Sequence, residues 1–228
     1  MKIQNIGKEY LSCFFKYILS IFTAVSIISV STIIALNLKF IYKLIIYKYN
    51  LIDITGVSAE NLMKEYGGLI NYLQNPFIKS LKFENFIMSP YGEIHFYEVK
   101  RIFIILIIIG IIFLIINLIY FIIGRVKNNR IYIIKIIKNL NSGSNILIGF
   151  FIVLIGVYFI DFSKAFIIFH KIFFRNDYWI FDERIDPIIK ALPEDLFMIY
   201  GAVILGIIIL IATAIKTVNR RVIMREEN

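Results

Sequence analysis

IFIILIIIGIIFLIINLIYFII, residues 102–123, decides the fold, because it runs for 22 residues without a charged side chain. Arg101 precedes this run and Arg125 follows it closely. About 20 helical residues cross the hydrocarbon core of a bilayer. Only a helix satisfies its own backbone groups where no water is present. The run therefore predicts a transmembrane helix.

Three further apolar runs have similar lengths and cover residues 17–38, 146–169 and 196–215. Only the run at 146–169 contains charges, Asp161 and Lys164, and their spacing predicts an ion pair within the span. Hydrophobic residues make up 59% of the chain. The sequence therefore predicts an all-α integral membrane protein with four transmembrane helices, in a single membrane domain over residues 1–228.

The charges predict the orientation of these helices. The N-terminus, residues 124–145 and the C-terminus together hold twelve cations and three anions, whereas the two remaining loops are balanced. Loops rich in Lys and Arg stay in the cytoplasm. We therefore expect a cell-membrane protein with both termini cytoplasmic, and we do not interpret its net charge of +9 as nucleic-acid binding.

The two outer segments, residues 39–101 and 170–195, are expected to form a small extracellular cap. Ser58 is a predicted N-cap, and an apolar stripe of helical spacing follows it at Leu62, Tyr66, Leu69, Ile70 and Leu73. On the opposite side of the membrane, residues 130–140 alternate Ile with Lys and are expected to lie along the cytoplasmic interface.

The only two histidines are predicted to share one depth at the outer membrane boundary. His95 lies just before the second span and His170 at the outer end of the third. Histidine exchanges protons near neutral pH, so such a pair can serve as base and acid. The alternative is that each is an interfacial aromatic with a polar tip. Glu98, one turn after His95, either orients that imidazole or is a solvated carboxylate at the helix start.

The second outer loop begins HKIFFRNDYWIFDERIDP, residues 170–187, and mixes aromatic with charged side chains. It suits either an interfacial aromatic belt or a pocket for a lipid-linked substrate, which needs apolar walls and a few polar anchors. Asp182 and Asp186 either line such a pocket or brace the loop. The candidate supporting and substrate-binding residues are Tyr91, Glu98, Lys100, Phe174, Arg175, Asp177, Trp179, Asp182 and Asp186.

Two stretches resemble elements of a known family. HFYEVK at residues 95–100 is similar to the H-x-x-D-V-K element of the lipoprotein intramolecular transacylase family of Gram-positive bacteria. Residues 170–197 resemble that family's FH…FF.ND.W..D...D..I...P..FF element, and the expected four-span layout with its cap also matches. One residue departs from the pattern, because Glu98 stands where the family has Asp.

The resemblance implies a reaction at the extracellular face. Such enzymes move the sn-2 acyl chain of a diacylglyceryl lipoprotein to the α-amino group of its N-terminal cysteine, which yields the lyso-form lipoprotein. It implies that His95 and His170 are catalytic, with their individual roles left open. No cofactor or metal is expected, since an amide is more stable than an ester. The expected partners are lipoproteins in the outer leaflet and membrane lipids, with no nucleic acid, and the expected state is a monomer.

Two other functions stay open at this point. One is a metal-dependent membrane hydrolase with His95, His170 and either Glu98 or Asp177 as ligands, since three such ligands suffice for catalytic zinc. The other is a non-catalytic membrane protein, such as an assembly or sensor subunit.

Overall fold

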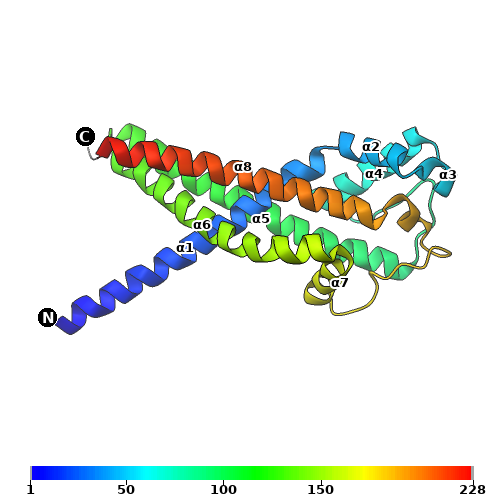
Figure 1. Cartoon of the computed structure of the whole chain (residues 1–228), viewed down its shortest axis with the longest axis horizontal. Coiled ribbons are helices and arrows are strands. Elements are labelled where there is room, and N and C mark those ends of the chain that lie inside the picture. Colours follow the sequence, from blue (N-terminus) through cyan, green and yellow to red (C-terminus); the bar gives the residue numbers. More distant parts are fainter. Residues whose placement is uncertain (1, 227–228) are drawn as a thin grey trace. The chain divides into compact units, whose positions relative to one another are not determined.

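The chain is helical, with short turns and two long loops, residues 75–89 and 174–186, between the helices (Figure 1). The structure, a computed structural model, describes the backbone of residues 2–226 and the side chains of residues 13–151 and 161–224. The charges of Lys2, Lys8, Glu9, Arg225, Glu226 and Glu227, which the orientation argument uses, lie outside the described side chains. The helices are α1 (Lys2–Asn37), α2 (Phe40–Lys48), α3 (Leu51–Thr55), α4 (Ala59–Gln74), α5 (Pro90–Val126), α6 (Arg130–Ile160), α7 (Phe162–Phe173), the 3-10 helix η1 (Pro187–Ala191) and α8 (Glu194–Glu226).

Three of the predicted spans fall inside helices that are long and apolar enough to cross a membrane. These helices are the Cys13–Asn37 part of α1, the whole of α5, and the Glu194–Met224 part of α8. They contain the apolar runs predicted at residues 17–38, 102–123 and 196–215, apart from Leu38, which lies just beyond the end of α1. The sequence pattern was therefore sufficient to find them.

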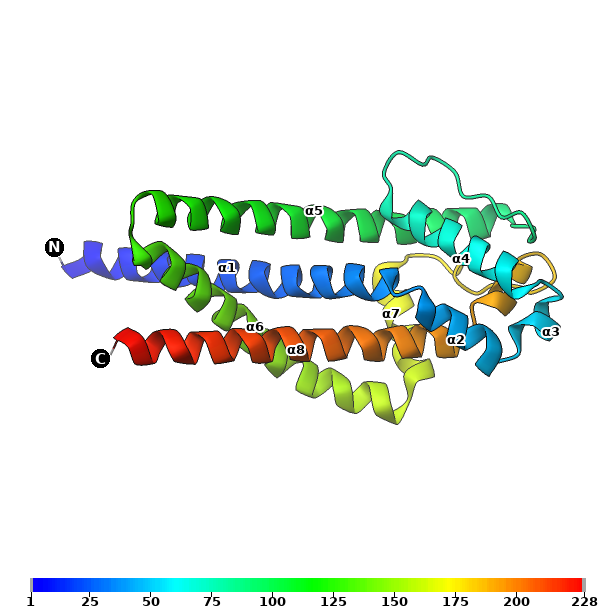
Figure 2. The same cartoon turned by 90° about the horizontal axis from the view of Figure 1, so that it is seen from above.

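The prediction of one uninterrupted helix over residues 146–169 is wrong. α6 ends at Ile160 and α7 begins at Phe162, and Figure 2 shows the chain turning between them. Asp161 takes an extended conformation and caps α7, because its carboxylate accepts from the backbone N–H of Lys164 at 3.0 Å. The predicted ion pair between Asp161 and Lys164 is present at 2.9 Å. The side chains of residues 152–160, inside this predicted span, lie outside the described residues.

Residues 130–140 do not form a separate interfacial segment in the structure. They are the beginning of α6, which continues without interruption to Ile160. The alternation of Ile with Lys in this stretch therefore belongs to a long helix, and its position relative to the membrane stays a prediction.

The chain divides into two compact units, the first of which comprises residues 1–31, 108–156 and 205–228. In Figure 2, α6 crosses α1 and α8 obliquely within this unit. A Cβ atom added to Gly143 of α6 would lie 2.5 Å from a methyl group of Thr23 in α1. Small residues let membrane helices approach this closely. The hydroxyl groups of Ser20, Thr23 and Ser26 donate to carbonyls four residues earlier, so α1 buries these three polar side chains at little cost.

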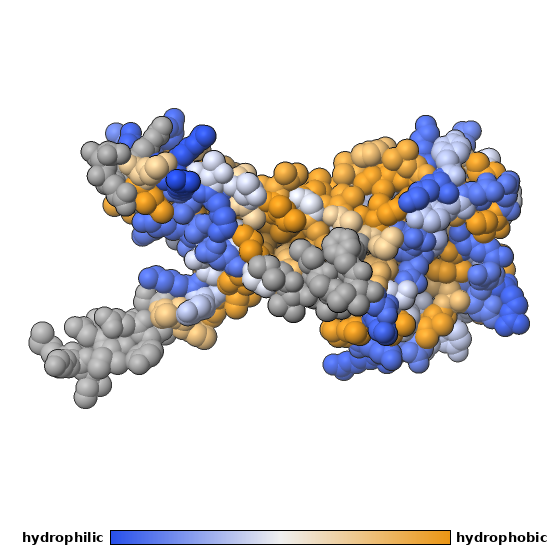
Figure 3. All heavy atoms as spheres, viewed as in Figure 1, coloured by the Kyte–Doolittle hydropathy of each residue, from blue (hydrophilic) through white to orange (hydrophobic). Residues whose placement is uncertain are grey.

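The second unit comprises residues 32–107 and 157–204 and contains the segments predicted to form a cap. Here α2 packs on α3 and α4, and α3 packs on η1. The ring of Tyr66, from the predicted stripe, stacks on Tyr42 with centroids 4.1 Å apart, and the Tyr42 hydroxyl donates to the carbonyl of Ala191 at 3.0 Å. Ser58 caps α4 as predicted. Hydrophilic residues gather over these helices in Figure 3. A small folded group therefore exists, whereas its extracellular location stays a prediction.

Two buried charged side chains hold the long loop between α4 and α5. The Glu65 carboxylate accepts from the backbone N–H groups of Glu84 and Asn85, at 2.8 and 2.6 Å, and from the Asn85 amide at 2.8 Å. The Lys100 ammonium donates to the carbonyl of Ile78 and lies 4.3 Å from the centre of the Tyr72 ring. These contacts hold residues 75–89 against α4 and α5. They thereby fix the path of the chain into the start of α5.

Candidate active site

His95 lies near the start of α5, and a cap on that helix holds it in place. Ser89 precedes Pro90, the first residue of the helix, a position that proline favours because its missing N–H is not needed there. The carboxylate of Asp186, from the second outer loop, accepts from both the backbone N–H and the hydroxyl of Ser89 at 2.6 Å. The Ser89 hydroxyl accepts in turn from the N–H of Gly92 at 3.0 Å. Asp186, which is 3% exposed, therefore braces the helix end that carries His95.

Only glycine fits at position 92. A Cβ atom there would lie 2.6 Å from a carboxylate oxygen of Asp186 and 3.1 Å from the ring of Phe181. The close approach of the second outer loop to the first turn of α5 thus depends on this missing side chain. It brings Phe181 against His95, with ring centroids 5.5 Å apart.

His170 lies in the last turn of α7, and its tautomer is set by its own helix. Its Nδ1 lies 2.7 Å from the carbonyl oxygen of Phe166, one turn earlier. A carbonyl only accepts, so Nδ1 carries the hydrogen and the neutral ring keeps its lone pair on Nε2. Burial lowers the pKa of His170 below its ordinary value of 6.5, because desolvation disfavours the cation. The lone pair on Nε2 is therefore available at neutral pH.

The two histidines, 75 positions apart in the chain, meet in the second unit. Their ring centroids are 5.8 Å apart, and the side chains are 6% and 7% exposed. Phe174 contacts both rings, at 4.8 Å from His95 and 5.5 Å from His170. Trp179 stacks on His170 with centroids 4.7 Å apart and ring planes 29° apart. The result is a pair of imidazoles enclosed by aromatic side chains.

Glu98 does not hydrogen-bond to His95. One of its carboxylate oxygens accepts from the Asn176 amide at 2.9 Å, which ties α5 to the second outer loop. Three polar atoms of this unit are buried without a hydrogen-bond partner among the described residues: Nδ1 of His95, Oε2 of Glu98 and Nε1 of Trp179. Unpaired buried polar atoms are uncommon and often mark sites where a ligand completes the bonding.

The remaining predicted residues lie at different places. Phe174 and Trp179 contact the histidines, whereas Lys100 holds the long loop as described above. Tyr91 stacks on Tyr178 at the exposed surface, with centroids 4.7 Å apart. Asp182 forms an ion pair with Arg184 at 2.6 Å, whose hydrogen bonds lower the pKa of Asp182 to about 2. Arg175 and Asp177 are exposed.

Sequence reasoning missed several residues of this site. Phe166 and Phe181 contact the histidines, Asn176 holds Glu98, and Ser89 binds Asp186. A serine directly before a proline is a readable signal for a helix start, and it marks where α5 begins. Nothing in the local sequence of Asn176 or Phe181 indicates their partners, because those lie 78 and 86 positions away.

The ligand set of the metal-hydrolase alternative is not assembled in the structure. Among the residues whose placement is described, no three His, Cys, Asp or Glu side chains form a group that could hold a metal ion. One carboxylate oxygen of Glu98 is bound to Asn176, and Asp177 is exposed. Among the described side chains, neither carboxylate is grouped with both imidazoles as that alternative requires.

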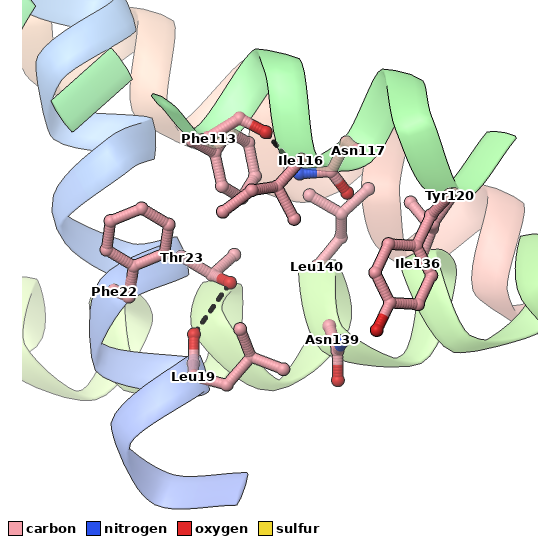
Figure 4. Close-up of a pocket in the computed structure, with 10 residues that line it drawn as sticks. All are labelled: Leu19, Phe22, Thr23, Phe113, Ile116, Asn117, Tyr120, Ile136, Asn139 and Leu140. Atoms are coloured by element: carbon pink, nitrogen blue, oxygen red, sulfur yellow. Dashed lines mark hydrogen bonds between the residues drawn. The ribbon is translucent and has the colours of Figure 1, made fainter. Parts of the chain in front are cut away.

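A cavity of about 80 Å³ lies in the first unit and contains neither histidine (Figure 4). The polar side chains of Thr23 and Asn117 are already bonded to their own helices, at the carbonyls of Leu19 and Phe113, both at 2.8 Å. The cavity thus offers mainly apolar surface. Its lining residues are Leu19, Phe22, Thr23, Phe113, Ile116, Asn117, Tyr120, Ile136, Asn139 and Leu140.

Comparison with known proteins gives a consistent picture. The family model described as lipoprotein intramolecular transacylase Lit matches residues 17–197. The in meso structure of the membrane-integral transacylase Lit from Bacillus cereus is 30% identical and covers 96% of this chain and 99% of its own, with a TM-score of 0.82. Structures of two variants of that protein, with a histidine replaced by arginine or by alanine, are 28% identical with TM-scores of 0.77. The arginine variant covers 100% of this chain and 99% of its own, and the alanine variant 98% and 99%.

No curated protein matches the chain. The family model nevertheless covers well over half of the sequence, and the solved structures align along nearly the whole of it. The long apolar helices described above agree with the membrane-integral nature of those structures. The chain therefore belongs to the lipoprotein intramolecular transacylase family.

Proposed function

We propose that this enzyme moves the sn-2 acyl chain of a diacylglyceryl lipoprotein to the α-amine of the lipoprotein's own N-terminal cysteine, with His95 and His170 as the acid–base pair. Family membership makes the chain an intramolecular acyltransferase of lipoproteins. The observation that carries the finer proposal is the meeting of the only two histidines, with ring centroids 5.8 Å apart, in one buried aromatic enclosure.

His170 is the general base in this scheme. Its Nδ1 hydrogen is bonded to the Phe166 carbonyl, so Nε2 is the free acceptor. The amine nitrogen attacks the ester carbonyl, a C–N bond forms, and Nε2 takes the proton that the nitrogen loses. When the C–O bond to the glyceryl group breaks, the proton passes to the departing oxygen, and His95 hydrogen-bonds that oxygen as it leaves. One proton is taken and one returned, so no cofactor is consumed.

The aromatic enclosure favours acyl transfer over hydrolysis. Phe174, Phe181 and Trp179 surround the imidazoles and exclude water, which would otherwise compete with the amine. Nucleophile and ester belong to one substrate molecule, so the enzyme's main task is to fold that molecule. Effective molarities of roughly 10⁵–10⁸ M are available from such positioning.

The proposal includes the membrane arrangement. We propose four membrane crossings, at residues 17–38, 102–123, 146–169 and 196–215, formed by α1, by α5, by α6 with the first part of α7, and by α8. Both termini face the cytoplasm, and the group of α2, α3, α4 and η1 forms an extracellular cap. The concentration of net positive charge at the termini and at residues 124–145 supports this orientation.

Mass spectrometry of a lipoprotein tests the reaction. Cells that lack other N-acylating enzymes and express this chain should produce lipoprotein with an acyl group on the cysteine nitrogen and a free glyceryl hydroxyl. His95→Ala and His170→Ala should each abolish the product, while Lys64→Ala, in an exposed ion pair of the same unit, should retain it at equal protein abundance. Unmodified diacylglyceryl lipoprotein from the wild-type chain, or full activity of either histidine variant, would count against the proposal.

A further inference from the structure

We propose that Trp179 binds the carbonyl oxygen of the reacting ester through its indole N–H, and that Glu98 binds the α-amine of the same substrate. This inference rests on the proposed function and deepens it. It identifies the two side chains that hold the reacting atoms, one on each side of the bond that forms.

The indole nitrogen of Trp179 is a donor without an acceptor. It is buried, and no hydrogen-bond partner for it is present among the described residues. Indole Nε1 can only donate, so an oxygen atom is what would complete it. The ring is stacked on His170 with centroids 4.7 Å apart. An oxygen bound to Nε1 would therefore lie beside the imidazole that we assign as the base.

Hydrogen bonds on both sides of Trp179 hold the backbone that carries the indole. The N–H of Tyr178 donates to the Asn176 side chain at 3.1 Å, and the N–H of Ile180 donates to the Asp177 carbonyl at 3.0 Å. Two turns thus fix the residues on either side of Trp179. A phenylalanine would fill the same stacking position without burying a polar group, so packing alone does not account for the indole N–H.

Glu98 supplies the complementary atom. Its Oε1 accepts from the Asn176 amide at 2.9 Å, whereas its Oε2 is buried without a partner among the described residues. An ionised carboxylate only accepts, so a donor is what would complete it. Glu98 follows His95 by three residues in α5, which places both on one face of the helix.

The substrate has hydrogen-bonding groups that can pair with both Nε1 of Trp179 and Oε2 of Glu98. Its reacting groups are one acceptor, the ester carbonyl oxygen, and one donor, the amine. As the C–N bond forms, negative charge moves onto the carbonyl oxygen and strengthens its hydrogen bond to Trp179. The amine keeps one N–H toward Glu98 while its other proton goes to Nε2 of His170. When the glyceryl C–O bond breaks, the C=O double bond re-forms and the glyceryl oxygen takes the proton from His170. The step is therefore balanced.

Substrate entry requires part of the second outer loop to move. Both unpaired atoms are closed to solvent, so the part of this loop around Asn176 and Trp179 must separate from α5 before a ligand reaches them. Asp186 keeps its hydrogen bonds to Ser89 during this movement. The hydrogen bond between Asn176 and Glu98 joins these two segments and is a contact that such a movement breaks.

The single tryptophan of the chain allows a sharp test. Expression in a tryptophan auxotroph with β-(3-benzothienyl)alanine replaces Trp179 alone, keeps the bicyclic ring and removes the N–H. We expect kcat toward a synthetic diacylglyceryl lipopeptide to fall by roughly 10²-fold with KM unchanged, the effect of losing one oxyanion donor. Enzyme made with 5-fluorotryptophan, which retains the N–H, is the matched control and should lose far less kcat than the benzothienyl enzyme.

Equal turnover of the two labelled enzymes would overturn the Trp179 assignment. If neither labelled enzyme folds, NMR of the wild-type chain is a second test, because ¹⁵N-labelled tryptophan gives one indole N–H resonance. Binding of a non-reactive lipopeptide, with an amide in place of the sn-2 ester, should move that resonance downfield, and an unmoved resonance would also overturn it. A wild-type chain that forms no N-acyl product would instead refute the proposed function itself.

The Glu98 assignment has its own measurement. Wild-type enzyme should bind the non-reactive lipopeptide with a free α-amine more tightly than its N-acetylated form. Glu98→Gln should remove this preference, because a glutamine side chain that keeps its oxygen on the Asn176 amide presents NH2, a donor, where Oε2 of Glu98 accepts. A preference for the free amine that survives in Glu98→Gln would overturn the assignment.

Discussion

His170 illustrates how one backbone contact assigns a chemical role. Its Nδ1 is committed to the carbonyl of Phe166, so only Nε2 can accept a proton. His95 has no equivalent contact, since its Nδ1 is buried without a partner among the described residues. The two residues are alike in the sequence, and their different surroundings separate their roles.

The pH dependence should follow His170. Burial lowers the pKa of its imidazole below 6.5, so the base stays neutral and active at pH 6.5 and activity is lost as the pH falls through the lowered pKa. With only two histidines, an NMR titration of their Cε1 protons gives two curves, and the His95→Ala variant assigns them. A midpoint for His170 above 6.5 would contradict the structure.

Asp186 shows how a single carboxylate joins two distant segments. It is buried, and it accepts two hydrogen bonds from Ser89. Asp186→Ala leaves the first turn of α5 without this cap and should lower the free energy of unfolding by about 1–3 kcal/mol. The matched variant is Asp182→Ala, whose partner Arg184 is exposed. Thermal unfolding in detergent should show a lower Tm for Asp186→Ala only, and equal Tm values for both variants would refute the brace.

At the scale of elements, the break between α6 and α7 is the main departure from the sequence pattern. Hydropathy over residues 146–169 indicates one long helix, whereas the Asp161 side chain competes for a backbone N–H and starts a new helix. This break affects the orientation of His170. The short helix α7 sets the direction of its side chain, so the direction does not follow from about 100° per residue along one continuous helix through Asp161.

The packing of α6 on α1 depends on Gly143. A Cβ atom there would lie 2.5 and 2.7 Å from Thr23 side-chain atoms and 3.1 Å from the backbone nitrogen of Ala24. Gly143→Ala should therefore destabilise the protein by about 1–3 kcal/mol through overpacking. Gly149→Ala in the same helix, with no atom within 4 Å, should be neutral or stabilising by up to about 1 kcal/mol. Thermal unfolding of both variants tests this, and similar Tm values would show that α1 and α6 are not in close contact.

At the scale of the whole molecule, membrane orientation decides whether the site faces its substrate. The proposed function places the lipoprotein substrate in the outer leaflet, so it requires the unit that contains both histidines to open there. The charge distribution predicts this orientation, because cations are retained in the cytoplasm.

Cysteine labelling checks this orientation. On a Cys13→Ser background, Ser80→Cys introduces a thiol at an exposed position of the cap, and Lys127→Cys introduces one at the exposed turn between α5 and α6. In intact cells a membrane-impermeant maleimide should label Ser80→Cys and spare Lys127→Cys. Both should be labelled once the membrane is opened. The reverse pattern in intact cells would invert the proposed topology.

The amino-acid sequence by itself determined the membrane class and three of the long helices, and it singled out two histidines whose rings the structure places 5.8 Å apart. Hydropathy and charge are summed over neighbouring residues, so a local reading is enough for them. Only the tertiary structure decided that Asp186 caps α5, that Trp179 stacks on His170 and that Asn176 holds Glu98. Two of these contacts join residues 78 or more positions apart, and the third depends on how a loop folds back onto a helix. Such pairings are settled by packing and buried hydrogen bonds, which no local pattern encodes.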